Sequence, residues 1–198
     1  MQHNSYEAPN AVLRITEKIS KMCVIVSGFI LLFAVGLIGV EVVLRKAFSI
    51  SIGGADELSS YALAICISWS LGYALIHKGH IRIDLLYSKL SDKLKSALDV
   101  LSLLSMLAFV APLTYFAYEV FHVSFLRNST ANTPLQTPMW IPQGIWFSGF
   151  LAFLVTILIV LVSSLILIFK KDYQGARNIA GASSVEEEIE EETGIRIK

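Results

Sequence analysis

The chain has 198 residues, of which 55% are hydrophobic and only 16% are charged, and its formal net charge is zero. Soluble domains usually carry about 25% charged residues, so the composition excludes an ordinary soluble domain and predicts an integral membrane protein. Six of the sixteen acidic residues fall between residues 186 and 192, which leaves the rest of the chain basic.

Four long apolar stretches follow one another along the chain. The length of each is close to the ~20 residues that a helix needs to cross roughly 30 Å of hydrocarbon. In lipid the backbone polar groups must be satisfied within the segment, so all four are predicted to be transmembrane helices. The stretches are residues 22–44, 58–76, 100–121 and 145–169. The predicted fold is an all-α membrane domain over residues 15–171, with disordered segments at 1–14 and 172–198.

Charged side chains gather where the first helix ends and the second begins. Glu41 and Arg45 are four residues apart, so they can pair on one helix face. Asp56 and Glu57 lie in the first turn of the second helix, where the helix dipole favours negative charge. We expect Arg45 to pair with Asp56 or Glu57 and to fasten the outer ends of the two helices.

The second helix carries a small residue at every fourth position, namely Ser60, Ala64, Ser68 and Gly72. Stripes of small residues let helix backbones approach closely in lipid, where no hydrophobic force drives helices together. The stripe is therefore predicted to face another helix, and a leucine at Gly72 is predicted to loosen assembly with a partner protein.

The connection that follows is also patterned. Leucines recur every fourth residue from Leu86 to Leu98, and lysines and serines fill most of the other positions. This pattern predicts an amphipathic helix over residues 84–97 that lies in the membrane interface and contacts lipid headgroups. Asp84 is placed to cap its N-terminus. The alternative is that these residues extend the third transmembrane helix.

The orientation follows from the basic residues that flank the helices, because these favour the cytoplasm. One side of a four-helix topology carries eleven of them, and the other side carries three. The eleven are Arg14, Lys18, Lys21, Lys78, Arg82, Lys89, Lys93, Lys95, Lys170, Lys171 and Arg177, and the three are Arg45, Lys46 and Arg127. Both termini are therefore predicted to be cytoplasmic.

The run from His77 to Asp84 raises the possibility of a metal site, because His77 and His80 have a zinc-like spacing. Zinc normally takes three or four protein ligands, and Asp84 is the only further candidate nearby. Lys78 and Arg82 would also repel a cation. We therefore interpret the run as a membrane exit, in which His80, Arg82 and Asp84 hold the second helix to the amphipathic one.

Two other classes of membrane protein stay open. A membrane anchor subunit of an electron-transfer complex would need histidines at matching depth to ligate haem. However, His77 and His80 end the second helix and His122 lies at the outer end of the third. A free-standing four-helix transporter or channel would need a charge near mid-membrane, and the candidates Glu41 and Glu119 are near the outer ends.

Three stretches resemble the small membrane subunit (DctQ-type) of tripartite ATP-independent periplasmic (TRAP) transporters. The matching features are an arginine that ends the first helix (Arg45), an acidic pair that opens the second (Asp56 and Glu57) and a proline-rich start of the fourth. The most specific part is the Gly-His-Ile-Arg-Ile-Asp run, residues 79–84. The resemblance covers about residues 15–170.

The resemblance implies a multi-pass protein of the bacterial inner membrane, with no cofactor of its own, no nucleic-acid partner and no enzymatic activity. Its partners would be a large multi-helix subunit, which carries the substrate and sodium sites, and a periplasmic binding protein that delivers an organic acid. The small subunit would brace the large one. We therefore expect a scaffold subunit of a sodium-driven transporter.

Overall fold

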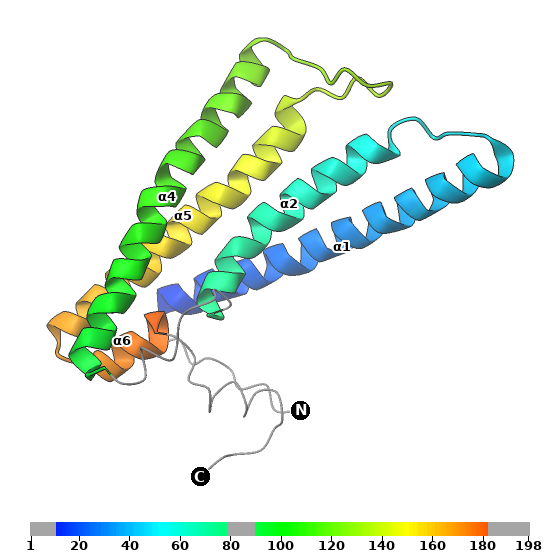
Figure 1. Ribbon diagram of the computed structural model, residues 1–198. Helices are drawn as coiled ribbons and strands as arrows, with labels where there is room; N and C mark the ends of the chain where they lie inside the picture. Colours follow the sequence, from blue (N-terminus) through cyan, green and yellow to red (C-terminus); the bar gives the residue numbers. More distant parts are fainter. Residues whose placement is uncertain (1–10, 79–89, 182–198) are drawn as a thin grey trace, which may run out of the picture.

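The computed structural model describes residues 11–78 and 90–181, and this part of the chain is helical (Figure 1). Its helices are α1 (Ala11–Phe48), α2 (Ala55–Ile76), α4 (Asp92–Leu126), α5 (Trp140–Phe169) and α6 (Tyr173–Ala180). The first four are long and apolar enough to cross a membrane. The predicted all-α fold with four transmembrane helices is therefore confirmed.

The four long helices form two pairs, α1 with α2 and α4 with α5, and α2 packs against α5 to join the pairs. We call the end where α1 begins and α5 finishes the terminal end, and the end with the α1–α2 and α4–α5 connections the loop end. Figure 1 shows that the pairs lie together at the terminal end and diverge toward the loop end. The buried core accordingly lies toward the terminal end and includes Leu13, Leu103, Ile157 and Ile179.

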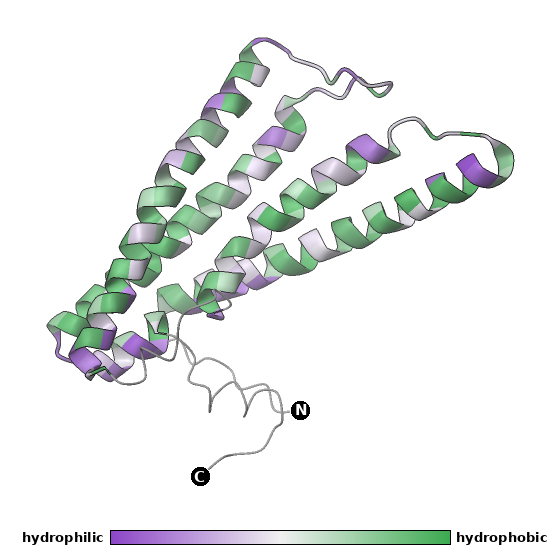
Figure 2. Ribbon diagram, in the orientation of Figure 1, coloured by the Kyte–Doolittle hydropathy of each residue, from purple (hydrophilic) through white to green (hydrophobic). Residues whose placement is uncertain are grey.

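Apolar side chains also cover the outside of the helices. Figure 2 shows apolar residues along most of each long helix, with polar ones concentrated near the ends. On α1 the rings of Phe29 and Phe33 are 68% and 72% exposed. Such a surface is stable only where lipid or other membrane helices cover it, because apolar groups are unfavourable in water.

The buried face of α1 repeats every seven residues, at Leu13, Ser20, Ser27, Ala34 and Glu41. A seven-residue repeat is the signature of left-handed coiled-coil packing, because it keeps one seam facing the neighbouring helix. Ser20, Ser27 and Ala34 are small enough for close approach, and Glu41 is polar and hydrogen-bonded. The repeat explains how α1 stays against α2 while most of its surface remains exposed.

The starts of two helices, α1 and α4, differ from the prediction. α1 begins at Ala11, so residues 11–14 are helical and not disordered. Residues 92–97 are the first turns of α4, which continues directly into the third span. For these residues the alternative of an extended third helix is correct, and no separate interfacial helix forms over residues 92–97. The rest of that predicted helix, up to residue 89, lies outside the described residues.

The predicted disordered tail also begins too early. Residues Tyr173–Ala180 form α6, which packs against α4 and α5 and buries Ala176, Ile179 and Ala180. The side chain of Asp172 caps this helix by accepting a hydrogen bond from the backbone N–H of Gly175 at 2.8 Å. The apolar residues lie three and four apart, on one helix face, and their burial offsets the entropy of ordering so short a helix.

Candidate functional site

A buried carboxylate organises the loop end of α1. Glu41 Oε1 accepts hydrogen bonds from Nη2 of Arg45 at 2.6 Å and from the Ser51 hydroxyl at 2.7 Å. Its Oε2 accepts a bond from the backbone N–H of Ile52, also at 2.7 Å. A carboxylate tolerates burial when its oxygens are paired and hydrogen-bonded in this way. Glu41 therefore holds both the last turns of α1 and the connection that follows them.

Arg45 pairs within α1 and not with the acidic pair that opens α2. It bonds Glu41, one helical turn away, and no ion pair within residues 11–78 joins it to Asp56 or Glu57. Asp56 lies near enough to attract it electrostatically across the connection. The Glu41–Arg45 pair that the four-residue spacing allows is therefore confirmed, whereas an ion pair of Arg45 with Asp56 or Glu57 is not formed, because the helix already places Glu41 within reach.

Glu57 links α2 to the α4–α5 connection, residues 127–139. Its Oε2 accepts a hydrogen bond from the Thr133 hydroxyl, and its Oε1 accepts one from the Tyr61 hydroxyl at 2.9 Å. The two helix pairs diverge at this end, and the bond from Thr133 ties the α4–α5 connection to α2 across the opening.

The α1–α2 connection fits under that loop because it contains two glycines. Gly53 and Gly54 have φ values of 61° and 138°, in the region that disfavours residues with a Cβ. A Cβ at Gly54 would also collide with the side chain of Leu135. Next to this contact is a crevice of about 230 Å³, lined by Glu41, Arg45 and further polar residues of both connections.

The predicted small-residue stripe of α2 is divided. Ser60 is exposed and donates to the carbonyl of Asp56, one turn earlier in α2, at 2.7 Å. Ala64 is half-buried, while Ser68 and Gly72 are fully buried against helices of this same chain. The prediction that the stripe faces another helix therefore describes the second half of α2.

The contact between α2 and α5 is close at two glycines. A Cβ on Gly149 of α5 would lie 2.5 Å from the Ser68 hydroxyl, and one on Gly72 would lie 3.3 Å from the Thr156 hydroxyl. Nε1 of Trp69 donates to the carbonyl of Ile145 at 3.0 Å. Because hydrocarbon gives no hydrophobic drive, this small-residue packing and its hydrogen bond are what join the two helix pairs.

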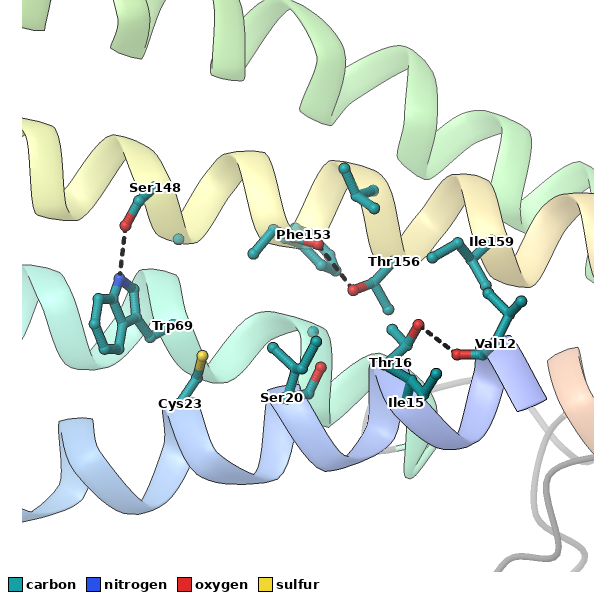
Figure 3. A pocket seen from close by; sticks show the side chains of 15 residues that line it. Val12, Ile15, Thr16, Ser20, Cys23, Trp69, Ser148, Phe153, Thr156 and Ile159 are labelled. Carbon is teal, nitrogen blue, oxygen red and sulfur yellow. Dashed lines mark hydrogen bonds between the residues drawn. The ribbon is translucent and has the colours of Figure 1, made fainter. Parts of the chain in front are cut away.

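An apolar groove lies beside that junction, between α1 and α5 with α2 as its floor. Its volume is about 510 Å³. Figure 3 shows Cys23, Ser20 and Ile15 of α1 facing Phe153 and Thr156 of α5 across the groove. The wall of α1 extends from Val12 to Cys23, and the wall of α5 from Ser148 to Ile159.

Three predicted site residues, His80, Arg82 and Asp84, lie outside the described residues, so their role stays a prediction. Just before them, Nε2 of His77 lies 3.7 Å from Oε1 of Glu17. No group of three His, Cys, Asp or Glu residues that could hold a metal ion occurs in the described ranges.

Sequence reasoning missed several of these contacts. It noticed that Glu41 can reach Arg45 but not that Glu41 accepts bonds from Ser51 and Ile52. It gave no role to Thr133 or to Gly149. Gly149 could have been found from the sequence. It lies seven residues before Thr156, about two helical turns, so both small residues share one face of a predicted transmembrane helix.

These features define a class, namely a four-helix membrane subunit whose ionised groups lie toward the helix ends. The family model for the DctQ component of tripartite ATP-independent periplasmic transporters matches residues 34–167. The chain belongs to this family and is thus the small membrane subunit of such a transporter. No curated protein and no solved structure was found to match it.

Membership assigns the chain to a transporter of the bacterial inner membrane and not to an enzyme family. Members of the family act together with a large membrane subunit and a binding protein. The contacts of the loop end and the junction of α2 with α5 are therefore properties of one subunit in a larger assembly.

Proposed function

We propose that the chain is the static scaffold of a sodium-driven, binding-protein-dependent importer of an organic acid, and that it braces the large subunit. In this proposal the large subunit binds the substrate and the sodium ions and makes the transport movement. The small subunit supplies a rigid membrane surface against which that movement takes place.

The observation that carries the proposal is the absence of ionisable groups from the middle of the spans. No Asp, Glu, Lys, Arg or His occurs in residues 22–40, 58–76, 100–118 or 140–169. Intramembrane ionisable residues mark the routes of ions and charged substrates, since an anion needs a compensating charge in hydrocarbon. A route for an organic anion through this chain alone is therefore unfavourable.

The loop end supports a rigid role. Glu41 and Glu57 each accept several hydrogen bonds, and together they tie down both loop-end connections. A moving subunit would need such bonds to break in each cycle. In a scaffold they stay formed, and they keep the diverging helix pairs at a fixed separation.

The charge distribution supports an orientation with the terminal end in the cytoplasm. Nine of the eleven Lys and Arg residues assigned to that side fall in the described ranges, where they lie along the early turns of α1 and α4, just after the ends of α2 and α5, and in α6, whereas Arg45, Lys46 and Arg127 lie at the loop end. Alkaline phosphatase fused after Gly181 is expected to be inactive, and the same enzyme inserted after Ser129 is expected to be active, because it folds only in the periplasm.

Transport tests the proposal directly. Liposomes that contain this chain with its large subunit and binding protein should accumulate an organic acid when a sodium gradient is imposed. Liposomes with the chain alone should show no uptake above protein-free vesicles. Uptake by the chain alone, or uptake that is independent of sodium in the complete system, would contradict the proposal.

A further inference from the structure

One face of α1 at the terminal end carries positive charge without a counter-charge among the described residues. Arg14, Lys18 and Lys21 follow one another at spacings of four and three residues, so they share a face of the helix, and all three are exposed. No ion pair with any of them forms within residues 11–78 and 90–181. Glu17, which lies between them in the sequence, is turned toward α2, with Oε1 3.7 Å from Nε2 of His77. We call the three cations the basic face of α1; like charges at this spacing repel one another, so the face favours an anionic partner.

The end of α6 lies close to this part of α1. Figure 1 shows the end of α6 near the start of α1, and Leu13, Ile179 and Ala180 belong to one buried cluster. Successive residues of a helix are rotated by about 100°, so the basic face begins about a quarter turn away from Leu13. On a helix about 10 Å wide, this corresponds to about 9 Å along the surface. Gly181, the last described residue, therefore brings the chain close to the basic face.

The part of the chain that follows Gly181 has the charge that this face attracts. Residues 182–185 are uncharged, and residues 186–192 consist of six glutamates and one isoleucine. Five residue steps from Gly181 to the first glutamate reach up to about 17 Å, which is more than the quarter turn requires. The acidic run itself can reach about 20 Å, and the three cations extend over about 10 Å of α1. Both the basic face and the acidic run lie outside the residues 34–167 that match the family model.

Two other groups of cations at the terminal end are less well placed. Lys170 and Lys171 precede α6 and so lie at the other end of that helix from Gly181, about 12 Å away along its axis. Arg177 is already paired with Asp92 at 2.7 Å. The basic face of α1 thus combines three cations with a position next to the end of α6.

We propose that the acidic run of residues 186–192 binds the basic face of α1 and holds the C-terminal part of the chain against the first helix. The run is tethered by a short segment, so its effective concentration at the face is about millimolar, and weak surface ion pairs are then sufficient to hold it. Salt screens exposed ion pairs, so the contact depends on ionic strength. While it is formed, the run covers cations that would otherwise attract anionic lipid headgroups.

Carbodiimide coupling tests the contact, because it joins a lysine amine directly to a carboxylate with no spacer between them. The full-length protein in phosphatidylcholine nanodiscs is coupled at low salt, digested and analysed by mass spectrometry. Links should join Lys18 and Lys21 to residues 186–192 of the same chain, and about 1 M salt should largely abolish them. Links to Lys93 or Lys170 as frequent as those to Lys18 would overturn the proposal, as would links that form only between two copies.

A charge variant that keeps both coupling lysines measures how the face holds the run. Arg14→Gln should lower the yield of links to Lys18 about threefold, as expected for the loss of one exposed ion pair. Arg127→Gln removes an exposed arginine at the loop end and should leave the yield unchanged. Circular dichroism and gel filtration check that each variant is folded. An unchanged yield in folded Arg14→Gln protein would overturn the proposal, because the run would then meet Lys18 without being held by the face.

Anionic lipid distinguishes the acidic run from the membrane as the occupant of the face. In nanodiscs that contain phosphatidylglycerol beside phosphatidylcholine, the links from Lys18 to residues 186–192 should persist, because the tethered run competes at high local concentration. Loss of these links in the anionic nanodiscs would assign the face to lipid headgroups and would overturn the proposal.

Discussion

The two ends of the helix bundle are held together by different forces. At the loop end the helix pairs diverge, and carboxylates such as Glu41 and Glu57 hold the connections by charge-assisted hydrogen bonds. Toward the terminal end, Ser68, Gly72 and Gly149 bring α2 and α5 into close contact. The difference follows from the surroundings, since polar bonds suit the membrane–water boundary and small-residue packing suits hydrocarbon.

The largest effect is expected at the small-residue contact that brings the two helix pairs together. Gly149→Leu should destabilise the protein by about 3 kcal/mol or more, because even its Cβ would overlap the side chains of Ser68 and Trp69. Thermal unfolding of the detergent-purified protein measures the change. Gly36→Leu is the matched control, since a Cβ at Gly36 meets nothing within 4 Å. If the two variants unfold at the same temperature, the close contact of α2 with α5 is not what stabilises the bundle.

A smaller effect is expected in the α1–α2 connection. Gly54→Ala should cost about 2 kcal/mol, because alanine is strained at a φ of 138° and its Cβ would displace Leu135. Gly53→Ala, at a φ of 61°, should cost about 1 kcal/mol, since that conformation is less strained for alanine. Denaturation of both variants by the same method gives the order, and a reversed order would contradict the fit between the two connections.

A local effect without global unfolding is expected at Glu57. Glu57→Gln removes the charge that accepts bonds from Thr133 and Tyr61 and so should loosen the connection of residues 127–139. Hydrogen–deuterium exchange should then become faster in that connection while the core of α5 stays protected. Glu119→Gln, another acidic residue at the loop end of α4, is a charge-matched control. Unchanged exchange in the Glu57 variant would show that the loop is held by other contacts.

The smallest effect is expected at α6. Nη1 of Arg177 lies 2.7 Å from Oδ1 of Asp92, but the Asp92 side chain is 67% exposed. Water screens such a pair, which limits its contribution to about 0–1 kcal/mol. A double-mutant cycle with Arg177→Gln and Asp92→Asn measures the coupling. A coupling well above this range would mean that the pair, and not the burial of Ile179, holds α6 in place.

Much of the architecture could be predicted because the membrane restricts it. Hydrophobic length alone identified four spans, and helix is the structure in which each span satisfies its own backbone. The periodicity of α2 also placed Ser68 and Gly72 correctly against another helix. These predictions succeeded because they depend on local pattern and on the solvent.

The remaining features depend on which residues meet across the fold. Nothing in the sequence near Glu57 indicates that Thr133, 76 positions away, donates to its carboxylate. The interfacial helix predicted for residues 84–97 failed over 92–97 because an amphipathic pattern also fits a helix that extends out of a span. α6 was missed because its burial against α4 and α5 outweighs its polar composition.

The proposed scaffold role makes the separation of the two helix pairs at the loop end the quantity to measure. Nitroxide labels at Ile52 and Leu126, exposed positions on the two pairs, report it by electron–electron double resonance in a variant whose Cys23 and Cys66 are replaced by alanine. In the complete transporter the distance distribution should stay the same when sodium, substrate and binding protein are added. A distribution that shifts or splits under transport conditions would contradict the account, since the small subunit would then take part in the movement.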